Sequence, residues 1–467
     1  MTLRIYNSLG RELSTFEPIR EGEVRMYTCG PTVWNYAHIG NFRTFVFEDV
    51  LRRYLKFKGF AVTQVMNITD VEDKIIKGMK LFNKSLEELT SFYERAFMED
   101  LSALNIEKAE KYPHATKHIP EMVELIKTLM RKGYAYRAED GSIYFDVSKF
   151  EGYGSLSGVR PSQLVAGARV KSDSYEKDQA NDFALWKAWD EDDGEVFWET
   201  ELGKGRPGWH IECSAMSMKY LGETFDIHTG GIDNKFPHHE NEIAQSEAAT
   251  GKKFVRYWLH SDFLNVKGEE MHKSVGNVVT FRELTKRGWK PRAIRLFLIG
   301  AHYRDKLDLT DESLQQAKTN IARMDAFATR LQESTVVDGG SGGVSQSVDF
   351  LKEFERAMDD DLNVAEALAA LYGFQRTVNS LIDSGALSRS GREAAFEALR
   401  RVDSVLGVMQ PEKTAPVSAR VEELIRERED ARRRRDYARA DEIREQLKEE
   451  GITIEDKPGG GTSWKTE

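Results

Sequence analysis

Residues 27–41 read YTCGPTVWNYAHIGN, and they join an apolar, β-prone run to an amphipathic helix. The run breaks at Gly30-Pro31, and apolar residues then recur at roughly helical spacing from Phe42 to Tyr54. A strand that feeds a helix through a tight turn is how nucleotide sites of α/β proteins are built. The N-terminus of such a helix offers N–H groups and a positive dipole end to a phosphate. The stretch therefore predicts an α/β nucleotide-binding unit.

A second β-prone run, from Phe60 to Ile68, completes a β-α-β unit and predicts a parallel sheet with a right-handed crossover. Ligands of open α/β sheets bind at the carboxyl ends of the strands, and Thr69 follows this run directly. Its hydroxyl could reach a ligand. It could also cap a helix, since Thr69 and Glu72 have the spacing of a capping box. The pattern favours the cap, and the two roles are compatible.

The composition is that of a globular protein with several domains. The chain has 467 residues, of which 40% are hydrophobic and 10% aromatic. It has no apolar run long enough to span a bilayer, and its N-terminus lacks the apolar core of a signal peptide, so we expect a cytoplasmic protein. The net charge of −10 argues weakly against a nucleic-acid partner, because a local basic face suffices for such binding.

Cys29 and Cys213 are the two cysteines of the chain, and a disulfide between them is not expected in a cytoplasmic protein. His238 and Glu242 are four residues apart on a predicted helix and share one face, whereas the partner of His239 at that spacing is Ile243. Thiolate, imidazole and carboxylate are zinc ligands. Spacing alone leaves two readings open, a zinc site or two apolar thiols beside a surface His–Glu pair.

Two motifs carry a family resemblance. His38-Ile-Gly-Asn41 and Glu270-Met-His-Lys-Ser274 are similar to the two signatures of class I aminoacyl-tRNA synthetases, and the chain as a whole resembles the cysteinyl-tRNA synthetases. The second motif departs from the family's Lys-Met-Ser-Lys-Ser, because Glu270 replaces the first lysine and His272 the first serine. Since Glu270 would repel a triphosphate, we expect its side chain to point away from the nucleotide.

The resemblance implies a Rossmann-type parallel-sheet catalytic domain that is split by a connective-peptide insertion and followed by all-α C-terminal domains. The implied boundaries are 1–110 and 201–300 for the catalytic halves, 111–200 for the insertion, 301–334 for a helical stem-contact region, 335–347 for a flexible Gly/Ser linker, 348–410 for a helical bundle and 417–467 for an anticodon-binding region.

The resemblance also implies a cysteine–tRNA ligase that forms cysteinyl-adenylate from L-cysteine and ATP and then charges tRNA(Cys). One zinc per chain would select the cysteine thiolate, Mg²⁺ would accompany ATP, and the expected state is a monomer. The implied residues are His38 and Lys273 for catalysis; His38, Gly40, Asn41, Gly231, Asp233, Lys273 and Ser274 for ATP; Thr69 and Trp209 for the substrate; Cys29, Cys213, His238 and Glu242 for zinc; and Arg432, Arg433, Arg434, Arg435 and Trp464 for tRNA.

Some of these residues also allow plainer interpretations. Trp209 could be a core aromatic, the glycines before Asp233 a simple β-turn, and the arginine run a solvated helix face. Two other functions stay open. One is a ligase that joins cysteine to a small amine, of the mycothiol-synthesis type, against which the long helical C-terminal region argues. The other is a non-catalytic synthetase paralogue with a broken second signature.

Overall fold

The computed structural model describes residues 2–158, 164–170, 180–271 and 276–409, and towards the C-terminus residues 424, 426–428, 430–432, 434, 436–449, 452–456 and 462–466. The chain divides into two compact units, Met1–Met409 and Gln410–Glu467. Among the described residues, no helix is both long and apolar enough to cross a bilayer.

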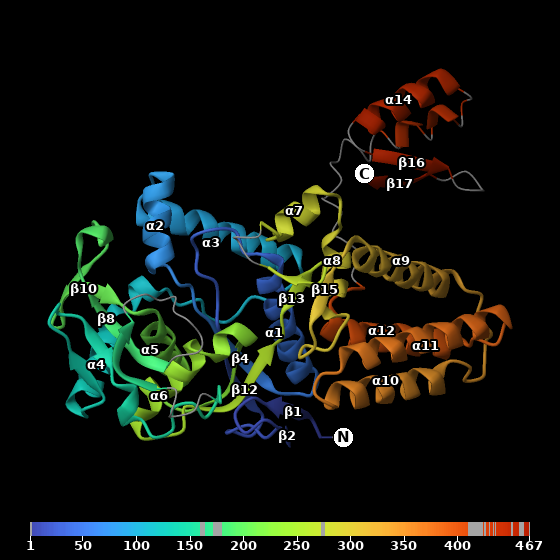
Figure 1. Cartoon of the computed structure of the whole chain (residues 1–467). Coiled ribbons are helices and arrows are strands. Elements are labelled where there is room, and N and C mark those ends of the chain that lie inside the picture. Colours follow the sequence, from blue (N-terminus) through green and yellow to red (C-terminus); the bar gives the residue numbers. More distant parts are fainter. Residues whose placement is uncertain are drawn as a thin grey trace. The chain divides into compact units, whose positions relative to one another are not determined.

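A four-stranded parallel sheet lies at the centre of the first unit (Figure 1). Its strand order is β12-β11-β3-β4, with β3 at Glu23–Thr28, β4 at Ala61–Met66, β11 at Phe225–Gly231 and β12 at Val255–Ser261. Helix α1 (Ile39–Phe57) connects β3 to β4, which confirms the predicted β-α-β unit. An antiparallel hairpin of β1 (Arg4–Asn7) and β2 (Glu12–Thr15) precedes the sheet.

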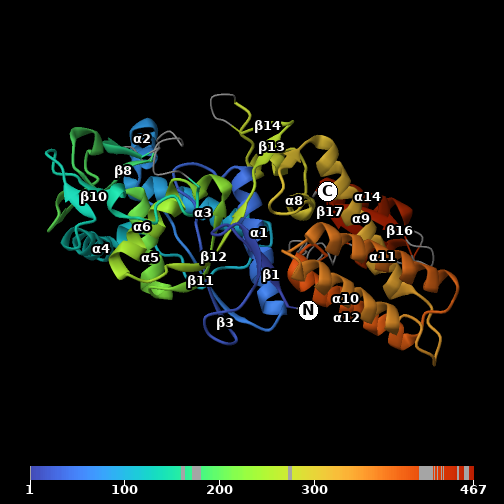
Figure 2. The same cartoon turned by 60° about the horizontal axis from the view of Figure 1, so that its bottom comes forward.

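Helices cover both faces of this sheet, as the α/β interpretation requires. Helix α1 lies on one side of the strands, whereas α5 (Trp209–Leu221) and α6 (His238–Thr250) lie on the other (Figures 1 and 2). The core-facing side of α1 is fully buried and includes Phe42, Val46 and Leu51. Two helices, α2 (Asp73–Phe82) and α3 (Leu86–Ala103), follow β4.

The predicted capping role of Thr69 is wrong. Helix α2 begins at Asp73, and Glu72 is its N-cap, with a side chain that accepts a hydrogen bond from Lys74 N at 3.1 Å. Thr69 lies in the preceding loop, where its hydroxyl accepts from Asn67 Nδ2 at 3.1 Å and donates to Glu212 Oε2 at 3.3 Å. These buried side chains hold the Thr69 hydroxyl at the end of the sheet.

The segment between the halves of the parallel sheet contains α4 (Ile119–Arg131) and a six-stranded sheet. The main path of this sheet is β5-β6-β8-β10-β9, and β7 pairs with β8. The strands are β5 (Ala135–Arg137), β6 (Ile143–Phe145), β7 (Leu164–Val170), β8 (Ala180–Ala188), β9 (Trp198–Thr200) and β10 (Gly203–Pro207). Short 3-10 helices lie at Ala115–Lys117, Val147–Lys149, Glu191–Asp193 and, after β11, at Ile232–Lys235 (η5).

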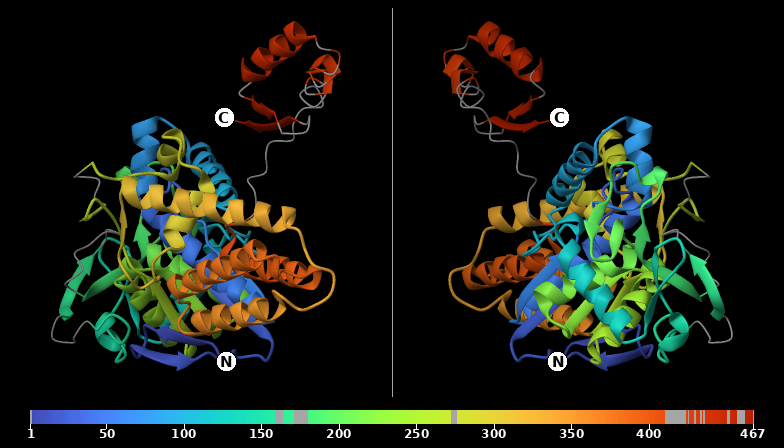
Figure 3. Two further views of the ribbon diagram at one scale, coloured as in Figure 1. Left: turned by 90° about the vertical axis from the view of Figure 1, so that its right-hand side faces the viewer. Right: turned by 90° about the vertical axis from the view of Figure 1, so that its left-hand side faces the viewer.

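After β12 the first unit continues with a small sheet and becomes helical. The sheet has the order β14-β13-β15, with β13 at Leu264–Val266, β14 at Glu269–Glu270 and β15 at Leu307–Leu309. Helices α7 (Phe281–Lys286) and α8 (Pro291–Ile299) lie between β14 and β15. Four longer helices follow, α9 (Asp311–Glu333), α10 (Val344–Asp359), α11 (Val364–Asp383) and α12 (Arg389–Leu406), and they pack as layers (Figure 3).

The glycine-rich stretch before α10 is packed, which differs from the flexible linker expected from its composition. Val337 N donates to Leu387 O at 3.0 Å, and Ser388 N donates to Gly342 O at 3.0 Å. A Cβ added at Gly391 would lie 1.8 Å from Gly342 O, so the two backbones approach more closely than any side chain allows. The last four residues of the expected linker belong to α10.

In the second unit, α14 (Tyr437–Glu449) is followed by β16 (Ile452–Asp456) and β17 (Thr462–Thr466). The two strands form an antiparallel hairpin in which Ile454 lies opposite Trp464. This hairpin adds a β element to a region for which the sequence predicted helices alone.

Candidate active site

A cavity of about 670 Å³ lies at the carboxyl ends of the parallel strands. It is lined by residues from both halves of the sheet, from the loop after β3 and from the segment after β14. Many of the predicted site residues line it, namely Cys29, His38, Gly40, Asn41, Thr69, Trp209, Cys213, Gly231, Asp233 and His238. The structure thus brings the two separately predicted groups, metal ligands and nucleotide contacts, into one cavity.

The four predicted metal ligands meet at the buried end of this cavity. Cys29 follows β3, Cys213 belongs to α5, and His238 and Glu242 lie on the first turns of α6. One ligand atom from each of the four lies within 4.8 Å of the others. All four side chains are buried, and both cysteines are free thiols. The described residues therefore contain a buried Cys/His/Glu cluster that is consistent with a zinc site.

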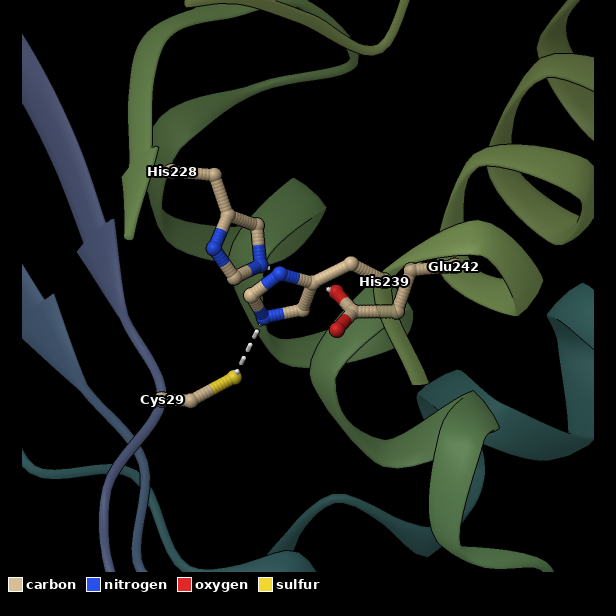
Figure 4. Close-up of side chains that lie close together, drawn as sticks. All are labelled: Cys29, His228, His239 and Glu242. Atoms are coloured by element: carbon tan, nitrogen blue, oxygen red, sulfur yellow. Dashed lines mark hydrogen bonds and ion pairs between the residues drawn. The ribbon is translucent and has the colours of Figure 1, made fainter. Parts of the chain in front are cut away.

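A second compact set overlaps the first. Cys29, His228, His239 and Glu242 also place one ligand atom each within 4.8 Å of one another, and their side chains converge in Figure 4. His239 Nε2 lies 3.3 Å from Cys29 Sγ, and His228 Nε2 lies 3.0 Å from Glu242 Oε2. His238 Nε2 lies 3.1 Å from the other carboxylate oxygen of Glu242. Glu242 thus links the two sets.

His228 and His239 are the residues that sequence reasoning missed. The helical spacing argument assumed that α6 buries one face, so His239 was placed on another face. In the structure α6 is buried almost all round from His238 to Ala249, so both neighbouring histidines face protein. In the sequence, the adjacent His238 and His239 lie four residues before a run without charged residues. This pattern could have signalled a helix that is buried on more than one face.

Further aromatic and imidazole groups hold these rings in place. The indole of Trp209 stacks on His238 with ring centroids 4.1 Å apart, and His210 Nδ1 lies 3.0 Å from His238 Nδ1. His239 Nδ1 lies 2.8 Å from His260 Nε2, and the other nitrogen of His260 lies 2.8 Å from Ser8 Oγ. Each histidine that could ligate a metal is therefore oriented by a second group, as is typical of metal sites.

Burial determines the protonation of this cluster. It lowers the pKa of both His238 and His210 to about 3 and lowers the pKa of His239 well below its usual value, so these imidazoles are neutral near pH 7. Burial, and secondarily the neighbouring Cys213, raise the pKa of the Cys29 thiol. Neutral imidazoles are competent metal ligands. A divalent cation would favour the thiolate forms of the two cysteines, which burial beside a carboxylate otherwise disfavours.

The first signature forms the start of α1. His38 is the N-cap: its Nδ1 accepts from Asn41 N at 3.2 Å, while Asn41 Oδ1 accepts from His38 N at 3.1 Å. Because Nδ1 acts as an acceptor, the neutral imidazole carries its proton on Nε2 and can donate from there. A Cβ at Gly40 would lie 2.6 Å from Met271 Cε, so this glycine allows the second signature to approach the first.

The glycines at the end of β11 have separate roles. A Cβ at Gly230 would lie 2.7 Å from His239 Cε1, so its absence makes room for the buried imidazole. A Cβ at Gly231 would lie 2.4 Å from Asp233 Oδ1. Asp233 itself lies in η5 and is exposed at the cavity. The simple β-turn is therefore replaced by a strand end and a 3-10 helix.

Of the second signature, Glu270-Met-His-Lys-Ser274, the structure describes only Glu270 and Met271. Glu270 belongs to β14, and its Oε1 lies 3.8 Å from Lys306 Nζ. The predicted ATP contacts Lys273 and Ser274, together with His272, lie outside the described residues.

The predicted tRNA contacts lie in the second unit. Arg432 and Arg434 are exposed, whereas Arg433 and Arg435 lie outside the described residues. The backbone of Trp464 belongs to β17.

Comparison with known proteins identifies the family. A family model described as the class I (C) tRNA synthetase catalytic domain matches residues 15–319. The chain belongs to the cysteinyl-tRNA synthetase family. Two further models match, a DALR domain at residues 353–410 and a cysteinyl-tRNA ligase anticodon-binding domain at 414–464.

Relatives of this family match along the entire chain. A cysteine–tRNA ligase of Solibacter usitatus is 47% identical over 468 residues and covers 100% of both chains. One from Protochlamydia amoebophila is 45% identical over 465 residues, which are 98% of this chain and 97% of that one. The two signature motifs and the C-terminal tail therefore predicted the correct family.

Solved structures of other synthetases share the fold. Methionyl-tRNA synthetase of Mycobacterium tuberculosis in complex with methionyl-adenylate superposes with a TM-score of 0.64 at 13% identity, over 84% of this chain and 92% of that one. A leucyl-tRNA synthetase of Agrobacterium radiobacter reaches 0.60 at 11% identity, over 84% and 85%. At these identities the likeness concerns the fold, and it confirms the predicted α/β class I architecture with helical C-terminal domains.

Proposed function

We propose that this chain activates L-cysteine with ATP and transfers the cysteinyl group to the 3′-terminal adenosine of tRNA(Cys). One observation carries the proposal: a single cavity is lined both by the Cys29 and Cys213 thiols and by the His38 signature at the start of α1. An amino-acid carboxylate and an ATP α-phosphate must meet in one place for an adenylate to form. Holding two reactants together in this way is the main contribution an enzyme makes to such a step.

Cys29, Cys213, His238 and Glu242 would hold one zinc ion per chain. When bound, zinc supplies a bond to the substrate thiolate, which serine cannot match. The surrounding protein keeps this end dry, since the side chains of all four ligands are buried. Trp209 orients His238 by stacking and, with Thr69, lines the cavity where the amino acid would bind.

The other end of the cavity would bind ATP with its Mg²⁺. Gly40 and Asn41 present the N-terminus of α1, and His38 would donate its Nε2 proton to a phosphate oxygen. Gly231 lets the nucleotide approach the backbone, and the Asp233 carboxylate would accept hydrogen bonds from ribose hydroxyls. Lys273 would stabilise the charge that develops on pyrophosphate, with Ser274 beside it.

The C-terminal unit would read the tRNA. Arg432, Arg433, Arg434 and Arg435 suit phosphates, and Trp464 suits an unpaired base on which it can stack. The match of residues 414–464 to an anticodon-binding domain supports this assignment. The domain boundaries set out above, a monomeric state and a cytoplasmic location are part of the same proposal.

The test is aminoacylation of total tRNA with cysteine and, separately, with serine, followed by metal analysis. We expect charging with cysteine alone and one zinc per chain. Cysteine-dependent pyrophosphate exchange without charging would indicate the amine-ligase alternative. Absence of both reactions would indicate a non-catalytic paralogue.

Truncation near Gln410 tests the second unit. The shortened chain should keep pyrophosphate exchange and lose most of its tRNA charging. Charging at the full-length rate, with unchanged salt dependence, would show that residues 417–467 do not read the tRNA.

A further inference from the structure

Thr69 lines the active-site cavity, and hydrogen bonds hold both its backbone and its side chain. Thr69 N donates to Pro31 O at 3.1 Å, and Val33 N donates to Thr69 O at 3.1 Å. The threonine is therefore tied to the loop that follows β3 and begins at Cys29. Thr69 is 1% exposed, so neighbouring side chains rather than bulk water determine how its hydroxyl is oriented.

Three hydrogen bonds in series run from a backbone amide to a buried carboxylate. Gly30 N donates to Asn67 Oδ1 at 2.8 Å, and Asn67 Nδ2 donates to Thr69 Oγ1 at 3.1 Å. Thr69 Oγ1 then donates to Glu212 Oε2 at 3.3 Å. The series has one direction, because a backbone N–H can only donate. Asn67 must therefore present its oxygen to Gly30 and its NH₂ group to Thr69.

This direction decides what the Thr69 hydroxyl can offer to a ligand. A hydroxyl has one proton and two lone pairs. The proton goes to Glu212 and one lone pair accepts from Asn67, so a single lone pair remains. With both neighbours in place, the Thr69 side chain can accept a hydrogen bond from a ligand in the cavity and cannot donate one.

Close packing keeps the series in this arrangement. Glu212 is 0% exposed and Asn67 is 2% exposed. A Cβ added at Gly30 would lie 1.8 Å from Asn67 O, so the glycine allows the loop after β3 to approach Asn67. Glu212 belongs to α5 and directly precedes Cys213. One helix therefore carries both a predicted metal ligand and the group that orients the Thr69 hydroxyl.

We propose that Glu212 is a positioning residue that makes Thr69 the acceptor for the α-ammonium group of the substrate cysteine. This inference rests on the function proposed above, in which the thiol meets the metal and the carboxylate meets the α-phosphate of ATP. The ammonium group is the third polar group of cysteine, and it only donates. It matches the remaining lone pair of Thr69, whereas a carboxylate, which only accepts, does not. A carboxylate behind the hydroxyl further favours a cation over an anion.

Two small thiols serve as probes, because each carries one of the two groups. Cysteamine has the ammonium without the carboxylate, and 3-mercaptopropionate has the carboxylate without the ammonium. Calorimetric titration of the zinc-loaded full-length chain measures both. Glu212→Gln removes the charge and allows an amide N–H to donate to Thr69. It should weaken the binding of cysteamine and of cysteine about tenfold and should not weaken that of 3-mercaptopropionate. Equal weakening of both probes would overturn the proposal.

A pair of variants at Thr69 tests the acceptor itself. Thr69→Val removes the hydroxyl and should show the same selective loss of cysteamine binding, whereas Thr69→Ser keeps the hydroxyl and should bind cysteamine as the wild type does. This pair decides the question even if Glu212→Gln folds poorly. Selective loss of 3-mercaptopropionate in Thr69→Val would mean that the hydroxyl donates to the carboxylate, and the proposal would be wrong.

The matched control is Glu240→Gln on α6, which also replaces a buried carboxylate close to the predicted metal ligands. Glu240 accepts from Gly154 N at 2.8 Å and from Ser157 N at 2.7 Å. The control should bind both probes as the wild type does, and a loss equal to that of Glu212→Gln would count against a specific role of Glu212. Zinc content and melting temperature, measured on every variant, report whether the metal site and the fold are intact.

Cysteine-dependent pyrophosphate exchange by the wild type reports separately on the proposed function. Exchange by the wild type together with no selective loss in the variants would refute the role of Glu212 alone. A wild type that binds neither cysteine nor cysteamine and shows no exchange would refute the proposed function and this inference with it.

Discussion

The two ends of the active-site cavity are built on opposite principles. At one end, Cys29, Cys213, His238 and Glu242 are buried and fixed by β3, α5 and α6. At the other end, the groups come from the first turn of α1 and from β14, where the Glu270 side chain is 41% exposed. The first end is buried and preorganised, whereas the second must admit and release a nucleotide.

This difference separates two kinds of selectivity. At the buried end, desolvation holds the histidines neutral and the packing of β3, α5 and α6 brings the ligand atoms close together. The metal proposed for this cluster would distinguish a thiol from a hydroxyl. At the exposed end, a cation has to offset the charge of the phosphates, a role that we propose for Lys273. Substitutions at the two ends should therefore affect different steps.

The largest effect is expected at the buried end. Cys213→Ser removes a thiolate ligand, and because outer-shell changes alone cost about 10–100-fold, we expect pyrophosphate exchange to fall on the order of 10³-fold or more. Cysteine binding should suffer more than ATP binding, and zinc content should drop. Ser217→Ala, a buried change one turn along α5, is the matched control and should keep both. Full activity in pure protein without zinc would refute the metal assignment.

The next effect is expected at the exposed end. Lys273→Ala should slow adenylate formation by about 10²–10³-fold, the usual cost of one lost charge donor, while zinc content stays unchanged. His272→Ala should matter less. Single-turnover adenylate formation measures both variants.

Glu270→Lys tests the departure from the family motif. Glu270 lines the cavity, and its carboxylate lies 3.8 Å from Lys306 Nζ, a cation that offsets its charge. We predict that this carboxylate points away from the phosphates. The substitution should then change activity little. A strong loss would show that Glu270 acts within the nucleotide site.

A smaller effect should decide between the two overlapping ligand sets. His238→Asn should lose zinc. His239→Asn should keep zinc and reduce exchange by about 10–100-fold, because His239 would act on the Cys29 sulfur from outside the ligand shell. Metal analysis of both variants gives the answer. The reverse result would assign the metal to Cys29, His228, His239 and Glu242.

The sequence predicted the fold and the family because the relevant signals are local. A strand, a Gly-Pro turn and an amphipathic helix are read within residues 24–54, and the signatures are short motifs. The cluster of Cys29 with Cys213 was predicted from the family resemblance, since spacing alone left open both a zinc site and two apolar thiols. The capping role of Thr69 failed because a buried contact with Glu212, far away in sequence, holds the threonine in the preceding loop.

Other features depend on tertiary packing that spacing does not encode. The burial of α6 on all sides brought His239 into the site, although helical periodicity had placed it on another face. The Gly/Ser stretch looked like a linker, yet Gly342 and Gly391 lie in close backbone contact.

The smallest effect concerns a single buried carboxyl group on α1 that contacts β11. Glu48 lies on α1 and is fully buried, and its Oε1 accepts from Thr229 Oγ1 at 2.7 Å, next to His228 on β11. Burial raises the pKa of Glu48 to about 8, against a usual value of 4.5. Between these two pH values the folded chain binds this proton and the unfolded chain releases it, so the contribution of Glu48 to stability falls as pH rises from 4.5 to 8 and is constant above and below.

Glu48→Gln keeps the acceptor for Thr229 and removes the titration. The melting temperature of this variant should therefore match that of the wild type near pH 5 and exceed it by a few degrees near pH 8. The exposed Glu87→Gln on α3 is the control and should show no such divergence. A difference between variant and wild type that stays constant from pH 5 to 8 would mean that Glu48 is ionised in the folded protein throughout this range.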